Sequence, residues 1–299
     1  MSVTLASARP AGLAPGTHEQ NADPGADETE SLILHVPEPG DPEYLEVAER
    51  GAVRAHRYLS RAHDRRRECW VYTPPGYDAP ESLAKSYPLL VLQHAGADTH
   101  QTWVAKGNVD WLLDALITEG RAVSMIVLML DNHPGGEPLY FDPTTRPAAT
   151  EDLRRELFED ALPLVEARYR VERSRELRAL AGPSVGGGQM LGIGLGNLDR
   201  FAWIGVFSAG YAVPGLLQSA LAAPALTNAH LRLLWIACAT EDEQFANNLA
   251  FIATLDSLGI RHHWSATPGE HTWPVWRRDL TEFLERVFQP CGVADADEA

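Results

Sequence analysis

Short, wholly apolar segments alternate along the chain with segments of helical periodicity. The apolar runs, each bounded by turn residues, lie at 88–93, 125–130, 177–181, 203–207 and 233–237, with a final strand at 263–266. The helical segments lie at 109–117, 151–169, 242–258 and 273–287, with one more directly after the run at 177–181. Apolar runs of this length are typical of strands buried on both faces of a parallel sheet. The alternation predicts an α/β fold, with a mostly parallel central sheet and helices on both faces.

The two ends of the chain do not follow this pattern. Residues 1–29 are rich in Ala, Pro, Gly, Asp and Glu without periodicity, which predicts a disordered acidic tail. We expect residues 30–290 to form one folded domain and residues 291–299 to form a short C-terminal tail. Strands are predicted at 52–60 and 67–72. The turn between them is interpreted as a solvated hairpin tip that carries Arg61, Arg65, Arg66 and Arg67.

A serine stands at the point where one predicted strand meets the next helix. The sequence there is Gly182-Pro-Ser-Val-Gly186, which places Ser184 in a G-x-S-x-G pattern. Glycines two residues before and after the serine let strand and helix pass closely, while the turn exposes the hydroxyl. Free N–H groups at the start of the helix would face the same point. The pattern predicts a nucleophilic serine at the carboxyl edge of the sheet.

An acid and a histidine follow the last two predicted strands. Ser184, then Asp242 and then His271 is the chain order expected when a serine nucleophile, an orienting acid and a base share the edge of an α/β sheet. His271 would take the serine proton and Asp242 would hold the imidazole ring. Glu241 remains an alternative acid. We therefore predict Ser184, His271 and Asp242 as the catalytic residues.

The same edge should hold two backbone donors for an oxyanion. One is the N–H of Val185, directly after the serine, and the other comes from the loop after the strand at 88–93, with Gly96 preferred over Ala95. His94 would shape that loop.

The cleft around the serine should contain the substrate-binding residues. The long segment after residue 130 is predicted to form a wall of the cleft. Aromatic side chains could stack on a substrate there. The predicted substrate-binding residues are His94, Trp103, Tyr140 and Trp273. No metal site is predicted, because the neighbouring His262 and His263 would point to opposite faces of a strand.

Composition narrows the range of partners. A net charge of −16 argues against nucleic acid or an anionic membrane. No run approaches the roughly 18 apolar residues of a membrane span, and the N-terminus lacks a signal-peptide pattern. Three cysteines far apart in sequence favour a reducing compartment. We expect a cytoplasmic protein with no nucleic-acid or membrane partner.

From residue 54 to residue 288 the chain resembles the esterase D and feruloyl esterase-like family of the α/β-hydrolases. The similar stretches are 71–77 (VYTPPGY), 110–121 (DWLLDALITEGR), 182–189 (GPSVGGGQ), 205–209 (GVFSA) and 269–276 (GEHTWPVW). Two features depart from the family. The loop at 94–97 reads His-Ala-Gly-Ala in place of a glycine-rich sequence, and Pro183 and Val185 flank the serine. The resemblance implies an α/β-hydrolase fold, ester hydrolysis without a metal or organic cofactor, and a homodimer. The connection from residue 208 to about residue 230 is too short for a large cap domain.

The leading hypothesis is a serine carboxylic-ester hydrolase that acts through an acyl-enzyme on a small-molecule or carbohydrate-linked ester. An acyltransferase would use the same acyl-enzyme and pass the acyl group to an alcohol or amine instead of water. A binding homologue with an impaired site is a third reading, motivated by the departures at 94–97 and Pro183.

Overall fold

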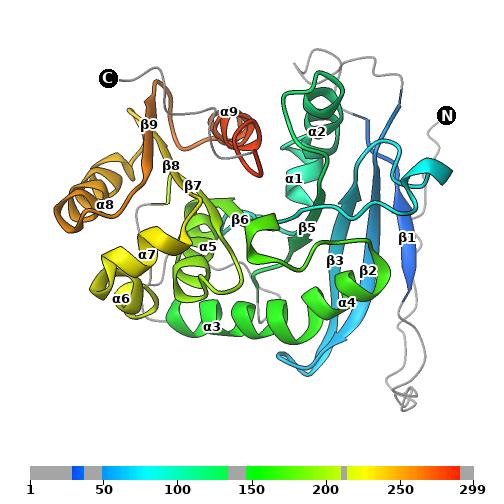
Figure 1. Ribbon diagram of the computed structural model, residues 1–299, viewed down its shortest axis with the longest axis horizontal. Helices are drawn as coiled ribbons and strands as arrows, with labels where there is room; N and C mark the ends of the chain where they lie inside the picture. Colours follow the sequence, from blue (N-terminus) through cyan, green and yellow to red (C-terminus); the bar gives the residue numbers. More distant parts are fainter. Residues whose placement is uncertain (1–28, 37–48, 134–145, 210–213, 290–299) are drawn as a thin grey trace, which may run out of the picture.

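Residues 29–36, 49–133, 146–209 and 214–289 are described by the computed structural model. They form one nine-stranded sheet in the order β1-β2-β3-β5-β4-β6-β7-β8-β9 (Figure 1). The strands are β1 (Glu30–Ile33), β2 (Ala52–Ser60), β3 (Arg65–Thr73), β4 (Leu89–Leu92), β5 (Ile126–Leu130), β6 (Arg178–Pro183), β7 (Trp203–Phe207), β8 (Leu233–Ala239) and β9 (His263–Thr267). β1, β2, β3 and β5 pair antiparallel in turn, and β5, β4, β6, β7, β8 and β9 pair parallel.

Helices cover both faces of this sheet, as the sequence pattern predicts. They are α1 (Thr102–Ala105), α2 (Val109–Thr118), α3 (Arg146–Glu156), α4 (Leu162–Arg168), α5 (Ser184–Gly196), α6 (Pro214–Ala222), α7 (Pro224–His230), α8 (Phe245–Leu258) and α9 (Trp273–Leu284). In Figure 1, α1, α2 and α9 lie on one side of the sheet and α3 to α8 on the other. Alternate residues of the buried strands therefore enter different cores. Leu90 and Leu92 pack with α1, α2 and α9, whereas Leu89 and Val91 pack with α3, α4 and α5.

The segment predicted as one helix at 151–169 is divided in the structure. A wide π-type turn at Leu157–Ala161 separates α3 from α4. Two buried acids, Glu156 directly before this turn and Asp160 within it, face the β2–β3 hairpin, where Asp160 accepts a hydrogen bond from Ser60 at 2.9 Å. The periodicity of the sequence does not reveal this turn, because a π turn shifts the helical register by a single residue.

The prediction of a wholly solvated hairpin tip is wrong for Arg67. This side chain is buried, and its Nε donates to Glu156 Oε1 at 3.0 Å while its terminal nitrogens donate to the carbonyls of Asp131 and His133. Burial would raise the pKa of Glu156, but the hydrogen bond from His63 and the charge of Arg67 hold that pKa below its ordinary value. Arg61 is exposed as predicted, and it pairs with Asp160 at 2.8 Å.

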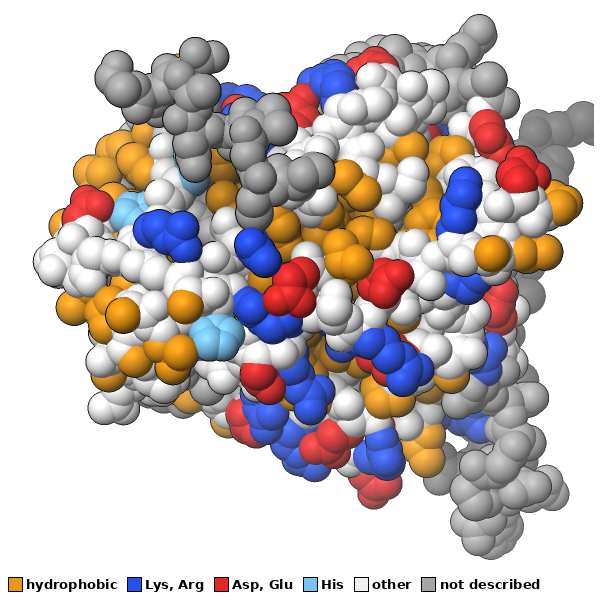
Figure 2. Space-filling view, viewed as in Figure 1, with side chains coloured by type: hydrophobic (Ala, Val, Ile, Leu, Met, Phe, Trp, Pro, Cys, Tyr) orange, Lys and Arg blue, Asp and Glu red, His pale blue; other side chains and the backbone are white. Residues whose placement is uncertain are grey.

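Surface charges of both signs are interspersed on the face seen in Figure 2, over the lower part where α3 and α4 lie. Arg154 and Glu151 on α3 form one such ion pair, at 2.5 Å. Among the described residues, only the short helices α6 and α7 lie between β7 and β8, so no large cap domain stands there. None of the described helices is long and apolar enough to cross a membrane. The predicted tails at 1–29 and 291–299 lie outside the described residues except for residue 29, and so does Cys291.

Replacing Glu156 by Gln should destabilise the domain by about 3–5 kcal/mol, because the change leaves the buried Arg67 charge without its carboxylate. Glu159→Gln is the matched control, since Glu159 is exposed on the next turn and pairs with Arg155 at the surface. Urea unfolding of both variants and the parent checks this prediction. Equal free energies of unfolding for the two variants would contradict it.

Candidate active site

Ser184 lies at a strained turn between β6 and α5. Its φ of 51° is in the left-handed region, which residues other than glycine adopt at a cost in energy. Close packing holds the turn in place. A Cβ atom added to Gly186 would lie 2.1 Å from the backbone oxygen of His94, and one added to Gly182 would lie 2.8 Å from the oxygen of Gln93. The start of α5 therefore packs directly against the loop after β4.

The structure brings together the three residues that the sequence analysis selects as catalytic. The Oγ of Ser184 lies 3.0 Å from Nε2 of His271, and Nδ1 of His271 lies 2.8 Å and 3.0 Å from the two carboxylate oxygens of Asp242. Asp242 follows β8, and His271 stands two residues before α9. The hydroxyl can donate to Nε2 while Nδ1–H donates to Asp242. This arrangement allows His271 to accept a proton from Ser184.

The choice between the two neighbouring acids follows from their contacts. Glu241 is exposed, and its carboxylate accepts hydrogen bonds from the Gly269 N–H and the Thr240 hydroxyl, away from His271. The carboxylate of Asp242 is fully buried. Burial would raise the pKa of Asp242, but hydrogen bonds from His271 and from the N–H of Gln244 keep that pKa below its ordinary value. Asp242 therefore stays ionised beside His271.

Aromatic rings pack around His271 from the α9 side. Trp276 stands perpendicular to the imidazole, with ring centres 4.9 Å apart, and Trp273 contacts both Trp276 at 5.3 Å and Trp103 at 4.9 Å. Trp276 is buried and Trp273 is half-buried. These contacts restrict rotation of the imidazole about its side-chain bonds.

The loop after β4 carries the second expected oxyanion donor, Gly96, which is buried. His94 has no exposed surface, and its Nδ1–H donates to the carbonyl of Ala95 at 2.7 Å. Its Nε2 accepts the N–H of Asn132 at 3.1 Å. Carbonyl and N–H of a trans peptide point in opposite directions, so this bond directs the Gly96 N–H away from the His94 ring. Both bonds require the neutral imidazole.

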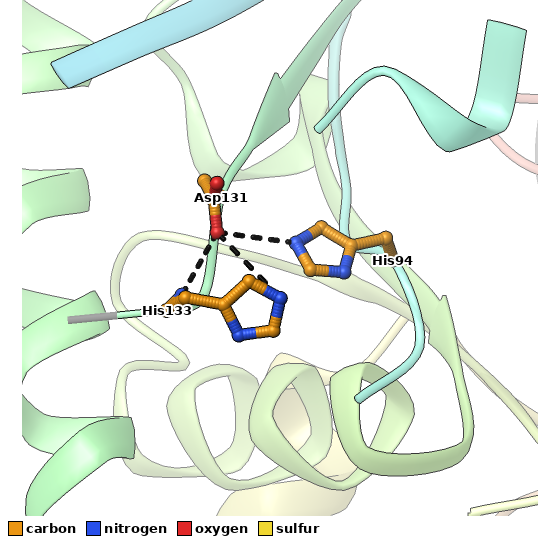
Figure 3. Close-up of side chains that lie close together, drawn as sticks. All are labelled: His94, Asp131 and His133. Carbon is orange, nitrogen blue, oxygen red and sulfur yellow. Dashed lines mark hydrogen bonds and ion pairs between the residues drawn. The ribbon is translucent and has the colours of Figure 1, made fainter. Parts of the chain in front are cut away.

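Asp131 lies between His94 and His133 (Figure 3). Its Oδ1 is 3.7 Å from Nε2 of His94 and 3.9 Å from Nε2 of His133. Burial would raise the pKa of Asp131, but His100 and the N–H of His133 keep it well below its ordinary range. Arg65, Arg66, Arg67 and Glu68, together with His100 and Asp131, line a polar cavity of about 220 Å³ beside this cluster.

The nitrogen and oxygen atoms of His94, Asp131 and His133 are close enough to one another to hold a metal ion. The facing ring nitrogens already have other partners, however, because Nε2 of His94 accepts from Asn132 and Nε2 of His133 donates to the carbonyl of Asp98. An ion would have to replace both of these bonds. We interpret the cluster as a hydrogen-bonded brace between the loop after β4 and the end of β5. Sequence reasoning places these residues after neighbouring strands but does not find the cluster.

Two of the predicted substrate-binding residues lie in the protein interior. Trp103 has no exposed surface and its Nε1 donates to the carbonyl of Gln93 at 2.8 Å. His94 is also fully buried. These two side chains support the loop after β4 and offer no surface to a ligand, so the expectation of direct contact is corrected. Trp273 is partly exposed. Tyr140, in the predicted cleft wall, lies outside the described residues.

The sheet order and the strand–serine–helix turn define an α/β-hydrolase fold. The family described as "Putative esterase" matches residues 60–287, which is most of the chain. The chain therefore belongs to this family of carboxylic-ester hydrolases.

Individual proteins and solved structures are also similar to this chain. A protein of Xylanibacter ruminicola named endo-1,4-beta-xylanase/feruloyl esterase is 23% identical over 73% of this chain, and the chain spans 29% of that relative's length. A ferulic acid esterase of Anaeromyces mucronatus is 22% identical, with a TM-score of 0.68 over 82% of this chain and 93% of the other. The feruloyl esterase module of Clostridium thermocellum, complexed with sinapinate, is 19% identical, with a TM-score of 0.69 over 90% and 99%.

Gly186→Ala should lower kcat for ester hydrolysis by about 10-fold to 1,000-fold. The added methyl group displaces the loop after β4, which carries the expected oxyanion donor Gly96, and loss of one such donor lowers kcat by up to about 1,000-fold. Gly215→Ala in α6 is the control, because a Cβ there meets no atom of the described residues within 4 Å. Steady-state kinetics of both variants, with circular dichroism to check folding, tests the prediction. A folded Gly186→Ala variant with parental kcat would contradict the close packing.

Proposed function

We propose that this protein is a serine esterase that hydrolyses carboxylic esters through an acyl-enzyme. The observation that carries the proposal is the continuous hydrogen-bonded chain from Ser184 through His271 to Asp242. Membership of the esterase family supports it. Ser184 is the proposed nucleophile, His271 the general base and acid, and Asp242 the residue that orients the imidazole.

The first half of the proposed cycle acylates Ser184. The Oγ attacks the ester carbonyl carbon while Nε2 of His271 removes the hydroxyl proton. The carbonyl oxygen becomes an oxyanion, which would accept hydrogen bonds from the N–H groups of Val185 and Gly96. When the carbon–oxygen bond to the alcohol breaks, His271 returns the proton to the leaving oxygen. The alcohol departs and the acyl group stays on Ser184.

The second half repeats these steps with water. His271 removes a proton from water as the water oxygen attacks the acyl carbon, and the proton then passes to Oγ as the acid leaves. Asp242 remains ionised throughout and stabilises the imidazolium at each stage. The cycle as proposed uses side chains and backbone N–H groups of this chain and requires no metal or organic cofactor.

For the substrate we propose a hydroxycinnamate ester, as a small molecule or linked to carbohydrate. The relatives named as feruloyl and ferulic acid esterases support this class. Trp273 stands two residues after His271, and its half-buried ring offers an aromatic surface for such a group. We expect a higher kcat/KM for methyl ferulate than for methyl acetate. Equal values, or a lower value for methyl ferulate, would contradict the hydroxycinnamate part of the proposal.

Asp242→Asn should lower kcat by about 10³-fold to 10⁴-fold, because an amide in place of the carboxylate favours the wrong imidazole tautomer. The matched control is Glu241→Gln, which changes the adjacent exposed acid in the same way and should leave kcat within about threefold. The measurement is hydrolysis of p-nitrophenyl acetate at pH 7.5. Equal losses in the two variants, or a larger loss in Glu241→Gln, would reject Asp242 as the orienting acid.

A further inference from the structure

The expected oxyanion donor Gly96 stands in a tight turn whose side chains contribute little packing. The N–H of Asp98 donates to the carbonyl of Ala95 at 3.1 Å, which closes a turn over residues 95–98 with Gly96 as its second residue. Ala95 ends in a methyl group, Gly96 has no side chain, and Ala97 is exposed. The position of this turn, which we call the oxyanion turn, therefore depends on hydrogen bonds to its backbone.

A buried histidine holds each end of the oxyanion turn. At its first residue, Nδ1–H of His94 donates to the carbonyl of Ala95 at 2.7 Å. At its last residue, Nε2–H of His133 donates to the carbonyl of Asp98. The two imidazole rings also pack against each other, with centres 5.1 Å apart (Figure 3). One pair of rings is thus tied to both ends of the turn.

His133 is itself fixed to the sheet by its backbone. It follows the last residue of β5 by three positions, and its N–H donates to Oδ1 of Asp131 at 2.9 Å. Its carbonyl accepts hydrogen bonds from two side chains of β3, Arg67 at 2.7 Å and Arg65 at 3.0 Å. Arg67 is held in turn by Glu156 at 3.0 Å. Because these contacts fix the backbone, the imidazole presents its N–H at a defined point beside the oxyanion turn.

The same contacts determine the direction of the Gly96 N–H. The carbonyl of Ala95 faces the N–H of Asp98 and the ring of His94. Since carbonyl and N–H of a trans peptide point in opposite directions, the Gly96 N–H points out of the turn. No hydrogen bond joins this N–H to another atom of the described residues. The loop packs against the start of α5 at Gly186, so the N–H is available to an oxyanion there.

We propose that His133 is a positioning residue for the oxyanion donor Gly96. By holding the carbonyl of Asp98, it keeps the far end of the oxyanion turn in place, while His94 keeps the near end. The proposal rests on the proposed function of the same site, in which the Gly96 N–H stabilises the oxyanion. Loss of the His133 hydrogen bond should weaken binding of the transition state more than binding of the substrate, because the negative charge on the oxygen develops only during the reaction.

The experiment compares two substitutions of His133 in hydrolysis of p-nitrophenyl acetate. Removal of one oxyanion donor lowers kcat by about 10²-fold to 10³-fold, and here the donor is displaced rather than removed. His133→Ala should therefore lower kcat by about 10-fold to 100-fold and leave KM within about threefold. A trifluoromethyl ketone, which forms an oxyanion on the serine, should lose affinity by a similar factor. His133→Gln should recover most of the activity, because its amide can donate to the same carbonyl.

His262→Ala is the matched control. The half-buried His262 also donates to a loop carbonyl, that of Ile260 at 2.9 Å, but it lies before β9 at the opposite edge of the sheet. This variant should keep kcat within about threefold of the parent value. Parental kcat in His133→Ala, equal losses in His133→Ala and His133→Gln, or a rise of KM without loss of kcat would overturn the proposal. If circular dichroism shows that His133→Ala does not fold, His133→Phe replaces it, since phenylalanine fills the space without a donor.

A measurement that needs no substrate separates this proposal from the proposed function. In NMR relaxation of glycine-labelled protein, the order parameter of the Gly96 amide should fall in His133→Ala and return towards the parental value in His133→Gln. An unchanged order parameter in His133→Ala would overturn the proposal, whether or not the protein hydrolyses esters. A parent protein that hydrolyses no ester would instead reject the proposed function, while the order parameter still reports on the oxyanion turn.

Discussion

The candidate site depends on the close approach of two backbone segments. The first turn of α5 packs against the loop after β4 so tightly that Gly186 leaves no room for a side chain beside the carbonyl of His94. This contact holds Ser184 in its left-handed conformation and packs the start of α5 against the loop that carries Gly96. Hydrogen bonds from His94 and Asn132 then fix the loop itself. Gly186, Ser184 and His94 therefore hold one another in place.

The buried carboxyl groups near these residues differ in whether they are ionised. After β8, Asp242 is held ionised by hydrogen bonds from His271 and the backbone. After β5, Asp131 is held ionised by His100 and the N–H of His133. The buried Oδ2 of Asp279 on α9 accepts no hydrogen bond from the described residues, and burial raises the pKa of this carboxyl. The difference lies in the number of donors that reach each carboxylate, since burial disfavours the charge of all three.

Much of the fold could be predicted from the chain alone. Apolar runs such as 125–130 identify the buried strands because only wholly buried strands lack alternation, and the glycines around Ser184 identify the strand–helix turn. Contacts between distant segments could not be predicted. Arg67 is buried because it pairs with Glu156, 89 residues away. Trp103 lies in the interior because its ring N–H donates to the carbonyl of Gln93, the residue after β4. Neither sequence pattern nor composition encodes such pairs.

The central claim is that Ser184 is a nucleophile activated by His271. Its most direct test is covalent labelling of the whole chain with a fluorophosphonate, followed by mass spectrometry of the intact protein and of its peptides. We predict one adduct per chain, located on Ser184, and labelling at least about 100-fold slower in His271→Ala. An adduct on another residue, or equal rates of labelling in the parent and His271→Ala, would contradict it.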